Sequence, residues 1–177
     1  MTQKAFFLDR DGIINVDHGY VNKVEDFEFT EGIFSLLKLL INNNFKLFIV
    51  TNQSGIGRNY YSKEEFSTLT EWMLSELKKR DIEIVSVHHC AHAPEENCNC
   101  RKPETGMVDE ILAKNEIDLE NSWMIGDKQS DIDLAKNSKI KQTIAIGERK
   151  IENATYSFKT ILECKLFLEE NQAIISA

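Results

Sequence analysis

The sequence contains no long apolar run. Its longest purely apolar stretches, such as residues 5–8, are far shorter than the roughly 18 residues that span a bilayer. No basic segment followed by a small-residue cleavage site accompanies them, so no secretory signal is indicated. We therefore expect a soluble, cytoplasmic protein that has no membrane partner.

Positive charge is also scarce. The chain has 21 lysines and arginines against 29 aspartates and glutamates, which gives a net charge of −8 at pH 7. Nucleic acids and anionic membranes are bound through basic surfaces that neutralise phosphates, so this balance argues against both as partners. Any phosphate that the protein binds must meet cations that are gathered locally.

The chain has only four cysteines, and three of them are clustered. Cys90, Cys98 and Cys100 lie close together in the sequence beside His92, whereas Cys164 stands alone and is expected to pack in the core. In a chain without an export signal, such clustering predicts a metal site and not disulfides. Three sulfurs and one imidazole form a closed tetrahedral set, which is typical of structural zinc.

The histidine of this zinc set is not fixed by spacing alone. His88 and His89 also lie close to the cysteines, but His88 is expected to end the predicted strand and His89 to cap it, which favours His92. The one-residue gaps from Cys90 to His92 and from Cys98 to Cys100 remain compatible with chelation, because side chains two apart in an extended segment lie on one side.

Short apolar segments alternate with segments of helical period, which predicts an α/β protein with a mostly parallel sheet. A chain of 177 residues can bury a core of its own, and we see no repeat and no linker, so one domain over residues 1–177 is expected. The predicted strands cover residues 4–8, 46–50, 84–88, 122–125 and 143–146. Helices are predicted around residues 33–40, 62–77, 108–115, 131–137 and 160–170, the second of them starting with a capping box of Ser62 and Glu65.

Polar side chains follow three of the predicted strands. Asp9 and Asp11 come after the first strand, Thr51 after the second and Asp127 after the fourth. Ligands of open α/β sheets bind beyond the carboxyl ends of the strands, so these side chains indicate one site. The two aspartates face the same way because they are two residues apart, and Gly12 allows the chain to turn away.

Four motifs occur in order: Asp9-Arg10-Asp11-Gly12, Thr51, Arg101-Lys102-Pro103 and Gly126-Asp127-x-x-x-Asp131. Over nearly the whole chain they resemble the motifs of the haloacid dehalogenase-like phosphatases. Residues 9–21, 51–55 and 98–103 resemble, within that family, the D-glycero-D-manno-heptose 1,7-bisphosphate phosphatases. Ile13 stands where these enzymes usually have threonine, which we interpret as a change in packing.

The resemblance implies a Rossmann-like three-layer fold with a zinc-binding loop. It favours His92 as the histidine ligand, and it makes the zinc a structural ion that fixes the loop before Arg101 and Lys102. No separate cap domain is expected, because the segments after Asp11 and Thr51 are too short for one.

The resemblance also implies residue roles in phosphate ester hydrolysis. Asp9 would be the nucleophile that forms an aspartyl phosphate, and Asp11 would protonate the leaving oxygen and then activate water. Thr51 and Lys102 would hold the phosphoryl oxygens.

A carboxylate that attacks a dianionic phosphoryl group meets a repulsion of roughly 8 kcal/mol, which a cation must offset. Hard oxygen ligands select Mg²⁺, and the resemblance assigns it to Asp9, the backbone carbonyl of Asp11, and Asp127. Asp131 would orient Lys102 or the metal's waters; alternatively it is only the N-cap of its helix.

The substrate implied is heptose 1,7-bisphosphate, which would lose its 7-phosphate in the synthesis of nucleotide-activated heptose for lipopolysaccharide. Expected substrate-binding residues are Asp17, His18, Gly19, Tyr20, Asn52, Gln53, Ser54, Arg101 and Lys128. Arg101 is the candidate for the second phosphate, because a guanidinium fork suits phosphate and the chain is acidic overall. A monomer is expected.

Three alternatives remain at this point. A histidinol-phosphate phosphatase or another small sugar-phosphate phosphatase shares the motifs. A signalling receiver domain also combines Asp, Thr, Lys and Mg²⁺, but its phosphorylated aspartate lies on a central strand, far from the N-terminal acidic pair. Here Asp9 and Asp11 share one strand end, which favours turnover over storage of the phosphoryl group. A zinc-stabilised binding module without catalysis is disfavoured by the intact Asp9, Asp11 and Asp127.

Overall fold

The computed structural model describes residues 2–176. A six-stranded sheet with the order β3-β2-β1-β4-β5-β6 lies at the centre, and all neighbouring strands in it run parallel. The strands are β1 (Ala5–Leu8), β2 (Lys46–Asn52), β3 (Ser86–Cys90), β4 (Trp123–Gly126), β5 (Gln142–Ile146) and β6 (Tyr156–Phe158). The expected α/β fold with a parallel sheet is confirmed.

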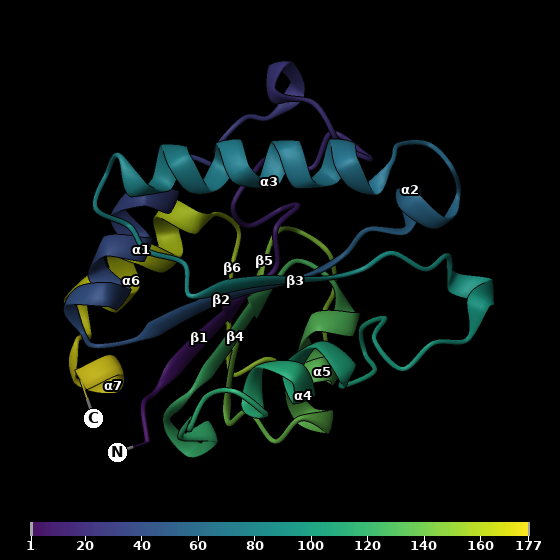
Figure 1. Ribbon diagram of the computed structural model, residues 1–177. Coiled ribbons are helices and arrows are strands. Elements are labelled where there is room, and N and C mark those ends of the chain that lie inside the picture. The colour runs from purple at the N-terminus through teal and green to yellow at the C-terminus, as the bar shows by residue number, and fades with distance from the viewer. Residues whose placement is uncertain (1, 177) are drawn as a thin grey trace.

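Helices cover both faces of this sheet, which makes three layers (Figure 1). One face is covered by α1 (Ile33–Asn42), α3 (Lys63–Lys78) and α6 (Ile161–Glu170), and the other by α4 (Gly106–Leu112) and α5 (Gln129–Asn137). Short elements complete the described chain: α2 (Ser54–Gly57), α7 (Ala173–Ser176), η1 (Val24–Asp26), η2 (Pro94–Glu96) and η3 (Leu119–Asn121). No helix within residues 2–176 is long and apolar enough to cross a membrane.

The central strand β1 divides its side chains between two apolar cores. Phe6 and Leu8 belong to the larger core under α1, α3 and α6, whereas Ala5 and Phe7 belong to the core under α4 and α5. This split follows from the alternation of side chains along a strand. All four residues are fully buried, as expected for a parallel sheet that is covered on both faces. The position of the strand end is thereby fixed by packing on two sides.

The capping box predicted for α3 is present. Ser62 Oγ accepts a hydrogen bond from the Glu65 amide at 3.1 Å, and the Ser62 amide donates to Glu65 Oε2 at 2.7 Å. Two amides that the helix itself cannot satisfy are thus paired.

The structure moves one predicted strand and adds short elements. β3 begins and ends two residues later than expected, so His89 lies inside the strand and does not cap it. The edge strand β6 and the single-turn helices α2 and α7 were not predicted, because three or four residues are too few to show a period. Between β1 and α1 the structure contains only η1, and between β2 and α3 only α2.

Candidate active site

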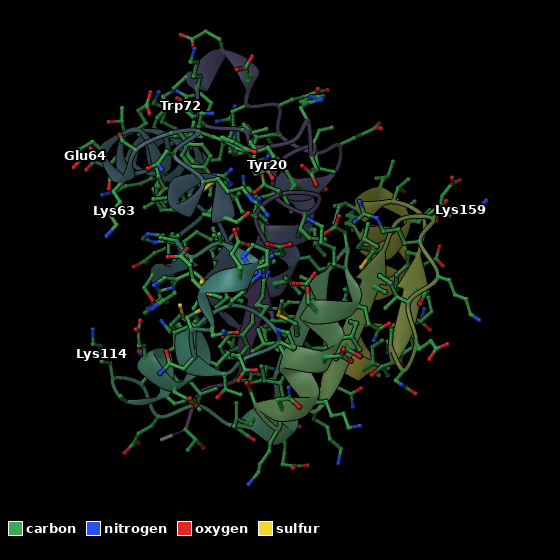
Figure 2. The ribbon with its side chains drawn as sticks, turned by 90° about the vertical axis from the view of Figure 1, so that its right-hand side faces the viewer. Tyr20, Lys63, Glu64, Trp72, Lys114 and Lys159 are labelled. Carbon is green, nitrogen blue, oxygen red and sulfur yellow. The ribbon has the colours of Figure 1, made fainter. Side chains whose placement is uncertain are left out.

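A cavity of about 340 Å³ lies where β1, β2 and β4 end. Eleven of the residues singled out in the sequence line it: Asp9, Asp11, Asp17, Gly19, Tyr20, Asn52, Gln53, Ser54, Arg101, Lys102 and Lys128. Tyr20 lies near the centre of the view in Figure 2, and its ring is about half exposed. The ends of parallel strands therefore gather these side chains, as the sequence indicated.

Lys102 places a buried cation between two carboxylates. Its Nζ lies 2.7 Å from Asp131 Oδ1 and 3.0 Å from Asp9 Oδ1, and it donates to the Val50 carbonyl at 2.9 Å. Burial alone would lower the pKa of Lys102, but the two carboxylates raise it above its ordinary value. Burial raises the pKa of Asp9 above its ordinary value, and the Lys102 charge offsets only part of this rise. Lys102 thus remains charged beside Asp9.

Asn52 ties the loop that contains Lys102 to the end of β2. The Lys102 amide donates to Asn52 Oδ1 at 2.9 Å, and Asn52 Nδ2 donates to the Lys102 carbonyl at 3.3 Å. These two bonds fix a backbone position fifty residues away in the sequence. Besides lining the cavity, Asn52 therefore positions the catalytic candidate Lys102.

Asp131 joins Lys102 to the start of α5. While its Oδ1 accepts from Lys102, its Oδ2 accepts from the amides of Asp127 at 3.1 Å and Lys128 at 3.0 Å. The N-cap of α5 is Lys128, and Asp131 is the third residue after it, so the alternative that Asp131 is the N-cap is wrong. A Cβ at Gly126 would lie 2.2 Å from the Asp131 side chain, which explains the glycine there.

The carboxylate of Asp11 is held at both oxygens. Oδ1 accepts from Arg10 Nη2 at 2.9 Å and from Asn15 Nδ2 at 3.0 Å, and Oδ2 accepts from Gln53 Nε2 at 2.9 Å. Burial raises the pKa of Asp11, but the Arg10 charge and these hydrogen bonds outweigh burial and hold it below its ordinary value. Since Asp11 also lines the cavity, a fixed carboxylate faces any ligand there.

The acidic residues at the strand ends fit a hard cation. Carboxylate oxygens of Asp9, Asp127 and Asp131 lie within 4.8 Å of one another. Asp131 uses both oxygens on Lys102 and backbone amides, whereas Asp127 Oδ1 is buried without a hydrogen-bond partner in the part of the chain described. Gly12 has a φ of +90°, and a Cβ there would lie 2.5 Å from Asp127 Oδ2. The donor set is oxygen only and closely spaced, as Mg²⁺ prefers.

Three of the residues predicted for catalysis, substrate or magnesium do not line this cavity: His18, Thr51 and Asp127, of which Asp127 lines a neighbouring one. His18 is half exposed, and its Nε2 lies 3.0 Å from Glu28 Oε2. Thr51 is fully buried, and its hydroxyl accepts from Gln53 Nε2 at 2.9 Å. Because the Thr51 oxygen accepts from Gln53, its own proton remains available for an acceptor.

Several residues at the site were not predicted from the sequence. Arg149, in the loop after β5, lies with Nη1 3.0 Å from Asp127 Oδ2. Asn15 and Tyr61 bond to residues of the site, and Tyr61 and Ser130 line the cavity. Asn15 and Ser130 lie inside motif stretches but were not assigned a role, and no motif marks Tyr61 or Arg149, because their contacts depend on folding of the chain.

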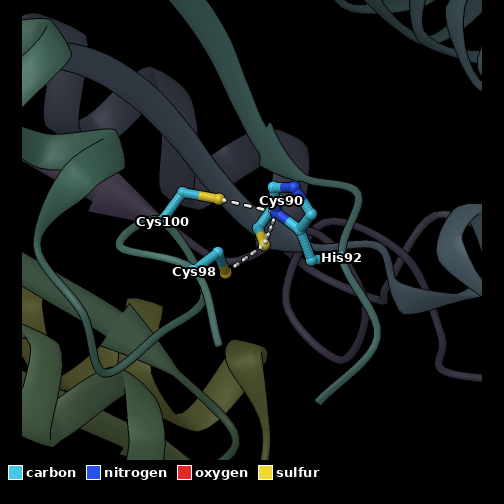
Figure 3. Close-up of side chains that lie close together, drawn as sticks. All are labelled: Cys90, His92, Cys98 and Cys100. Carbon is cyan, nitrogen blue, oxygen red and sulfur yellow. Dashed lines mark hydrogen bonds between the residues drawn. The ribbon is translucent and has the colours of Figure 1, made fainter. Parts of the chain in front are cut away.

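The predicted zinc ligands lie together beyond the end of β3 (Figure 3). Cys90 Sγ is 3.5 Å from both Cys98 Sγ and His92 Nδ1, and His92 Nδ1 is 3.2 Å from Cys100 Sγ. Sulfurs bound to one tetrahedral zinc at about 2.3 Å would be roughly 3.8 Å apart, so the spacing fits this ion.

The alternative histidines point elsewhere. His88 bonds to Ser86 and Glu110, and the ring of His89 packs on Phe66 with centroids 4.3 Å apart. His92 is therefore the histidine that the structure brings to the three cysteines.

The sequence is similar to a known family and to named phosphatases. Residues 4–160 match the family model described as Polynucleotide kinase 3 phosphatase. The D-glycero-alpha-D-manno-heptose-1,7-bisphosphate 7-phosphatase of Campylobacter jejuni is 46% identical over 173 residues, which are 96% of this chain and 98% of that protein. The D-glycero-beta-D-manno-heptose-1,7-bisphosphate 7-phosphatase of Helicobacter pylori is 44% identical over 169 residues, 95% of each chain.

Solved structures share the fold. A putative HAD-like phosphatase from Mesorhizobium loti has a TM-score of 0.83 at 25% identity, covering 99% of this chain and 87% of its own. The D,D-heptose 1,7-bisphosphate phosphatase of B. bronchiseptica, complexed with magnesium and phosphate, has a TM-score of 0.82 at 21% identity, covering 95% of this chain and 99% of its own.

Proposed function

Because the chain belongs to the polynucleotide kinase 3 phosphatase family of haloacid dehalogenase-like phosphatases, we propose that it removes the 7-phosphate from D-glycero-D-manno-heptose 1,7-bisphosphate. The observation that supports this most is the pair of Asp9 and Asp11 in one cavity with the buried cation of Lys102. Relatives with this activity in their names match nearly the full chain. Their names include both anomers, so either anomer is a candidate substrate.

Asp9 is the proposed nucleophile. Its Oδ1 accepts from the Arg10 amide at 2.7 Å and lies beside Lys102. Its Oδ2 has no hydrogen-bond partner within residues 2–176 and is the oxygen left to attack phosphorus. The new P–O bond makes an aspartyl phosphate while the bond to the sugar oxygen breaks. Lys102 and the hydroxyl of Thr51 hold the oxygens of the phosphoryl group.

Asp11 is the proposed acid and base. It lies two residues from the nucleophile. Its low pKa keeps it a carboxylate in the free protein, so it takes up a proton when the negatively charged phosphoryl group binds beside it, and it then gives that proton to the leaving sugar oxygen. As a carboxylate it then takes a proton from the water that opens the aspartyl phosphate, which releases inorganic phosphate and restores Asp9.

Asp9, Asp127 and the backbone carbonyl of Asp11 are the proposed Mg²⁺ ligands. When bound, the ion would offset the repulsion between the Asp9 carboxylate and the phosphoryl oxygens. We also propose that Cys90, His92, Cys98 and Cys100 hold one structural zinc.

A screen of phosphate release is the test of this function. Wild-type protein with Mg²⁺ is given both anomers of the bisphosphate, heptose 7-phosphate, histidinol phosphate and a 3′-phosphorylated oligonucleotide. We expect the highest kcat/KM on one anomer of the bisphosphate and release in excess of protein. A preference for histidinol phosphate or for the oligonucleotide would contradict the substrate, and release no greater than the protein present would contradict turnover.

Replacing Asp9 by Asn tests the covalent route. The Asn side chain keeps the shape of Asp9 but lacks a nucleophilic oxygen charge, so turnover should be lost while the circular dichroism spectrum and zinc content stay as in the wild type. Retained turnover in Asp9→Asn would rule out an aspartyl phosphate at this residue.

Arg101 is the proposed contact for the phosphate that stays on the sugar. It lines the cavity next to Lys102, and its Nη1 is buried without a hydrogen-bond partner in the described chain. A charged hydrogen bond contributes about 1.5–3 kcal/mol, or roughly a 10- to 150-fold change in binding. Arg101→Ala should lower kcat/KM by such a factor for the bisphosphate, mainly through KM, and far less for heptose 7-phosphate. Equal losses on both substrates would contradict this assignment.

The remaining proposals concern the setting of the reaction. We propose that the enzyme is a cytoplasmic monomer and that its product enters the synthesis of nucleotide-activated heptose. Sedimentation velocity of the purified protein tests the monomer, and a dimer at micromolar concentration would contradict it.

A further inference from the structure

The hydroxyl of Tyr61 lies behind the proposed acid and base, one side chain away from it. Tyr61 is only 5% exposed and donates to Gln53 Oε1 at 2.5 Å. Gln53 Nε2 in turn donates to Asp11 Oδ2 and to Thr51 Oγ1, both at 2.9 Å. A chain of hydrogen bonds therefore runs from Tyr61 through Gln53 to Asp11.

This chain fixes which way the Gln53 amide faces. An amide group can be turned by 180° with little change in shape, which exchanges its oxygen for its nitrogen. In the turned position, Gln53 Oε1 would face the Asp11 carboxylate, so two acceptors would meet, whereas the Thr51 and Tyr61 hydroxyls can each donate or accept. The carboxylate therefore sets which way the amide faces, and the hydrogen bond from the Tyr61 hydroxyl to Oε1 holds the side chain in that position.

We propose that Tyr61 is a positioning residue for the general acid of the reaction and acts through Gln53 on Asp11. This inference rests on the proposed phosphatase mechanism. As Asp11 gives up its proton to the leaving oxygen, negative charge develops on its carboxylate, and the Gln53 N–H at Oδ2 stabilises that charge. Tyr61 also lines the cavity, but its hydroxyl donates to Gln53 Oε1, so its effect on Asp11 is transmitted through Gln53.

Two features hold Tyr61 where this role needs it. A Cβ at Gly55 would lie 2.1 Å from Tyr61 Cε1, so the glycine makes room for the ring. Burial raises the pKa of Tyr61 to about 12, so the hydroxyl keeps its proton and remains a donor at neutral pH. The other oxygen of Asp11 is already held by Arg10 and Asn15, which leaves Gln53 as the donor at Oδ2.

The test compares two leaving groups in Tyr61→Phe, which removes only the hydroxyl. A sugar alkoxide needs a proton to leave, whereas the aryl oxygen of p-nitrophenyl phosphate does not. Loss of one neutral hydrogen bond is worth about 1 kcal/mol, or roughly fivefold. We expect kcat/KM for the heptose bisphosphate to fall about fivefold or more, and kcat/KM for p-nitrophenyl phosphate to stay near the wild-type value. The ratio of the two is independent of the fraction of protein that is folded.

Tyr156→Phe is the matched control, because Tyr156 is a partly buried tyrosine on β6, outside the cavity lining. It should leave both values unchanged. In a Gln53→Ala background, Tyr61→Phe should have no further effect on the ratio. An equal loss on both substrates, an unchanged ratio, or a full further loss in the Gln53→Ala background would overturn the proposal.

A readout without turnover separates this inference from the proposed function. The side-chain amide resonances of Gln53, assigned by their absence in Gln53→Ala, should shift in Tyr61→Phe and not in Tyr156→Phe. Unshifted resonances overturn the positioning role even in an active enzyme. If the wild type instead prefers histidinol phosphate, the assignment of the heptose substrate fails. Histidinol phosphate is also an alkyl ester, so the ratio of its kcat/KM to that of p-nitrophenyl phosphate then tests the role of Tyr61.

Discussion

The clearest test of the packing around the site is the removal of Asp131. This side chain is fully buried and accepts three hydrogen bonds, one from the Lys102 ammonium and two from backbone amides at the start of α5. Removing one partner of a buried ion pair costs about 3–5 kcal/mol. In Asp131→Ala, Lys102 still contacts Asp9 and the Val50 carbonyl, so the lower end of this energy range applies to the Asp131–Lys102 pair.

The two amides add to this cost. An unpaired buried amide costs about 1–3 kcal/mol, and the positions at the start of α5 are partly open to water, so the lower end applies again. We therefore expect Asp131→Ala to lower the free energy of unfolding by about 5 kcal/mol. Asp131→Asn keeps an oxygen for the amides but loses the charge that faces Lys102, so about half of this loss is expected.

Urea unfolding of the zinc-loaded protein at pH 7, followed by circular dichroism, gives these values. The pKa of Lys102 is raised from its ordinary 10.5, so its stabilising contribution is complete below that pH and is lost only as the pH rises beyond it. Asp133→Ala on the same helix is the control, since among residues 2–176 Asp133 accepts only from Gln129, and it is partly exposed. A loss for Asp131→Ala no larger than that of the control would refute the reasoning.

Two further predictions concern the cysteines. Protein purified without added metal should contain one equivalent of zinc by elemental analysis. Cys98→Ala should lower both the zinc content and the melting temperature, because the ion links the loop before Lys102 to the end of β3. Full stability without zinc would contradict this. Cys164 should not react with a thiol reagent in the native protein, because it is fully buried and burial raises the pKa of its thiol to about 12. Reaction of Cys164 as fast as in urea would show that this face of α6 is not packed against the core.

The sheet and the longer helices could be predicted because their burial repeats along the sequence. Residues 46–50 are apolar throughout except at the start, and the structure places them in β2. By contrast, β6 has only three residues, of which none is fully buried, so its pairing with β5 depends on the rest of the fold. The start of α3 was predicted correctly because a capping box is a local signal.

The candidate site was predictable to the extent that strand ends and motifs mark it. The resemblance supplied Asp9, Asp11 and Lys102, and the topology of a parallel sheet explains why they share a cavity. The link from Tyr61 to Asp11 could not be predicted, since both contacts of the intervening Gln53 side chain form only once the chain has folded. For His18 a motif position did predict a contact, with the substrate, but the structure places its side chain against Glu28.

The balance of charge in the cavity explains how an acidic protein can take a substrate with two phosphates. The lining contains three carboxylates, Asp9, Asp11 and Asp17, and three cations, Arg101, Lys102 and Lys128, so its formal net charge is zero while that of the whole chain is −8. Two of the cations are committed to carboxylates: Lys102 to Asp9 and Asp131, and Lys128 to Asp17 at 3.6 Å. A divalent cation at Asp127 would add positive charge where phosphate is transferred, and Arg101 remains as the one lining cation without a carboxylate partner among residues 2–176. Positive charge supplied by the metal favours the bisphosphate over the heptose monophosphate that remains after hydrolysis, which assists release of the product.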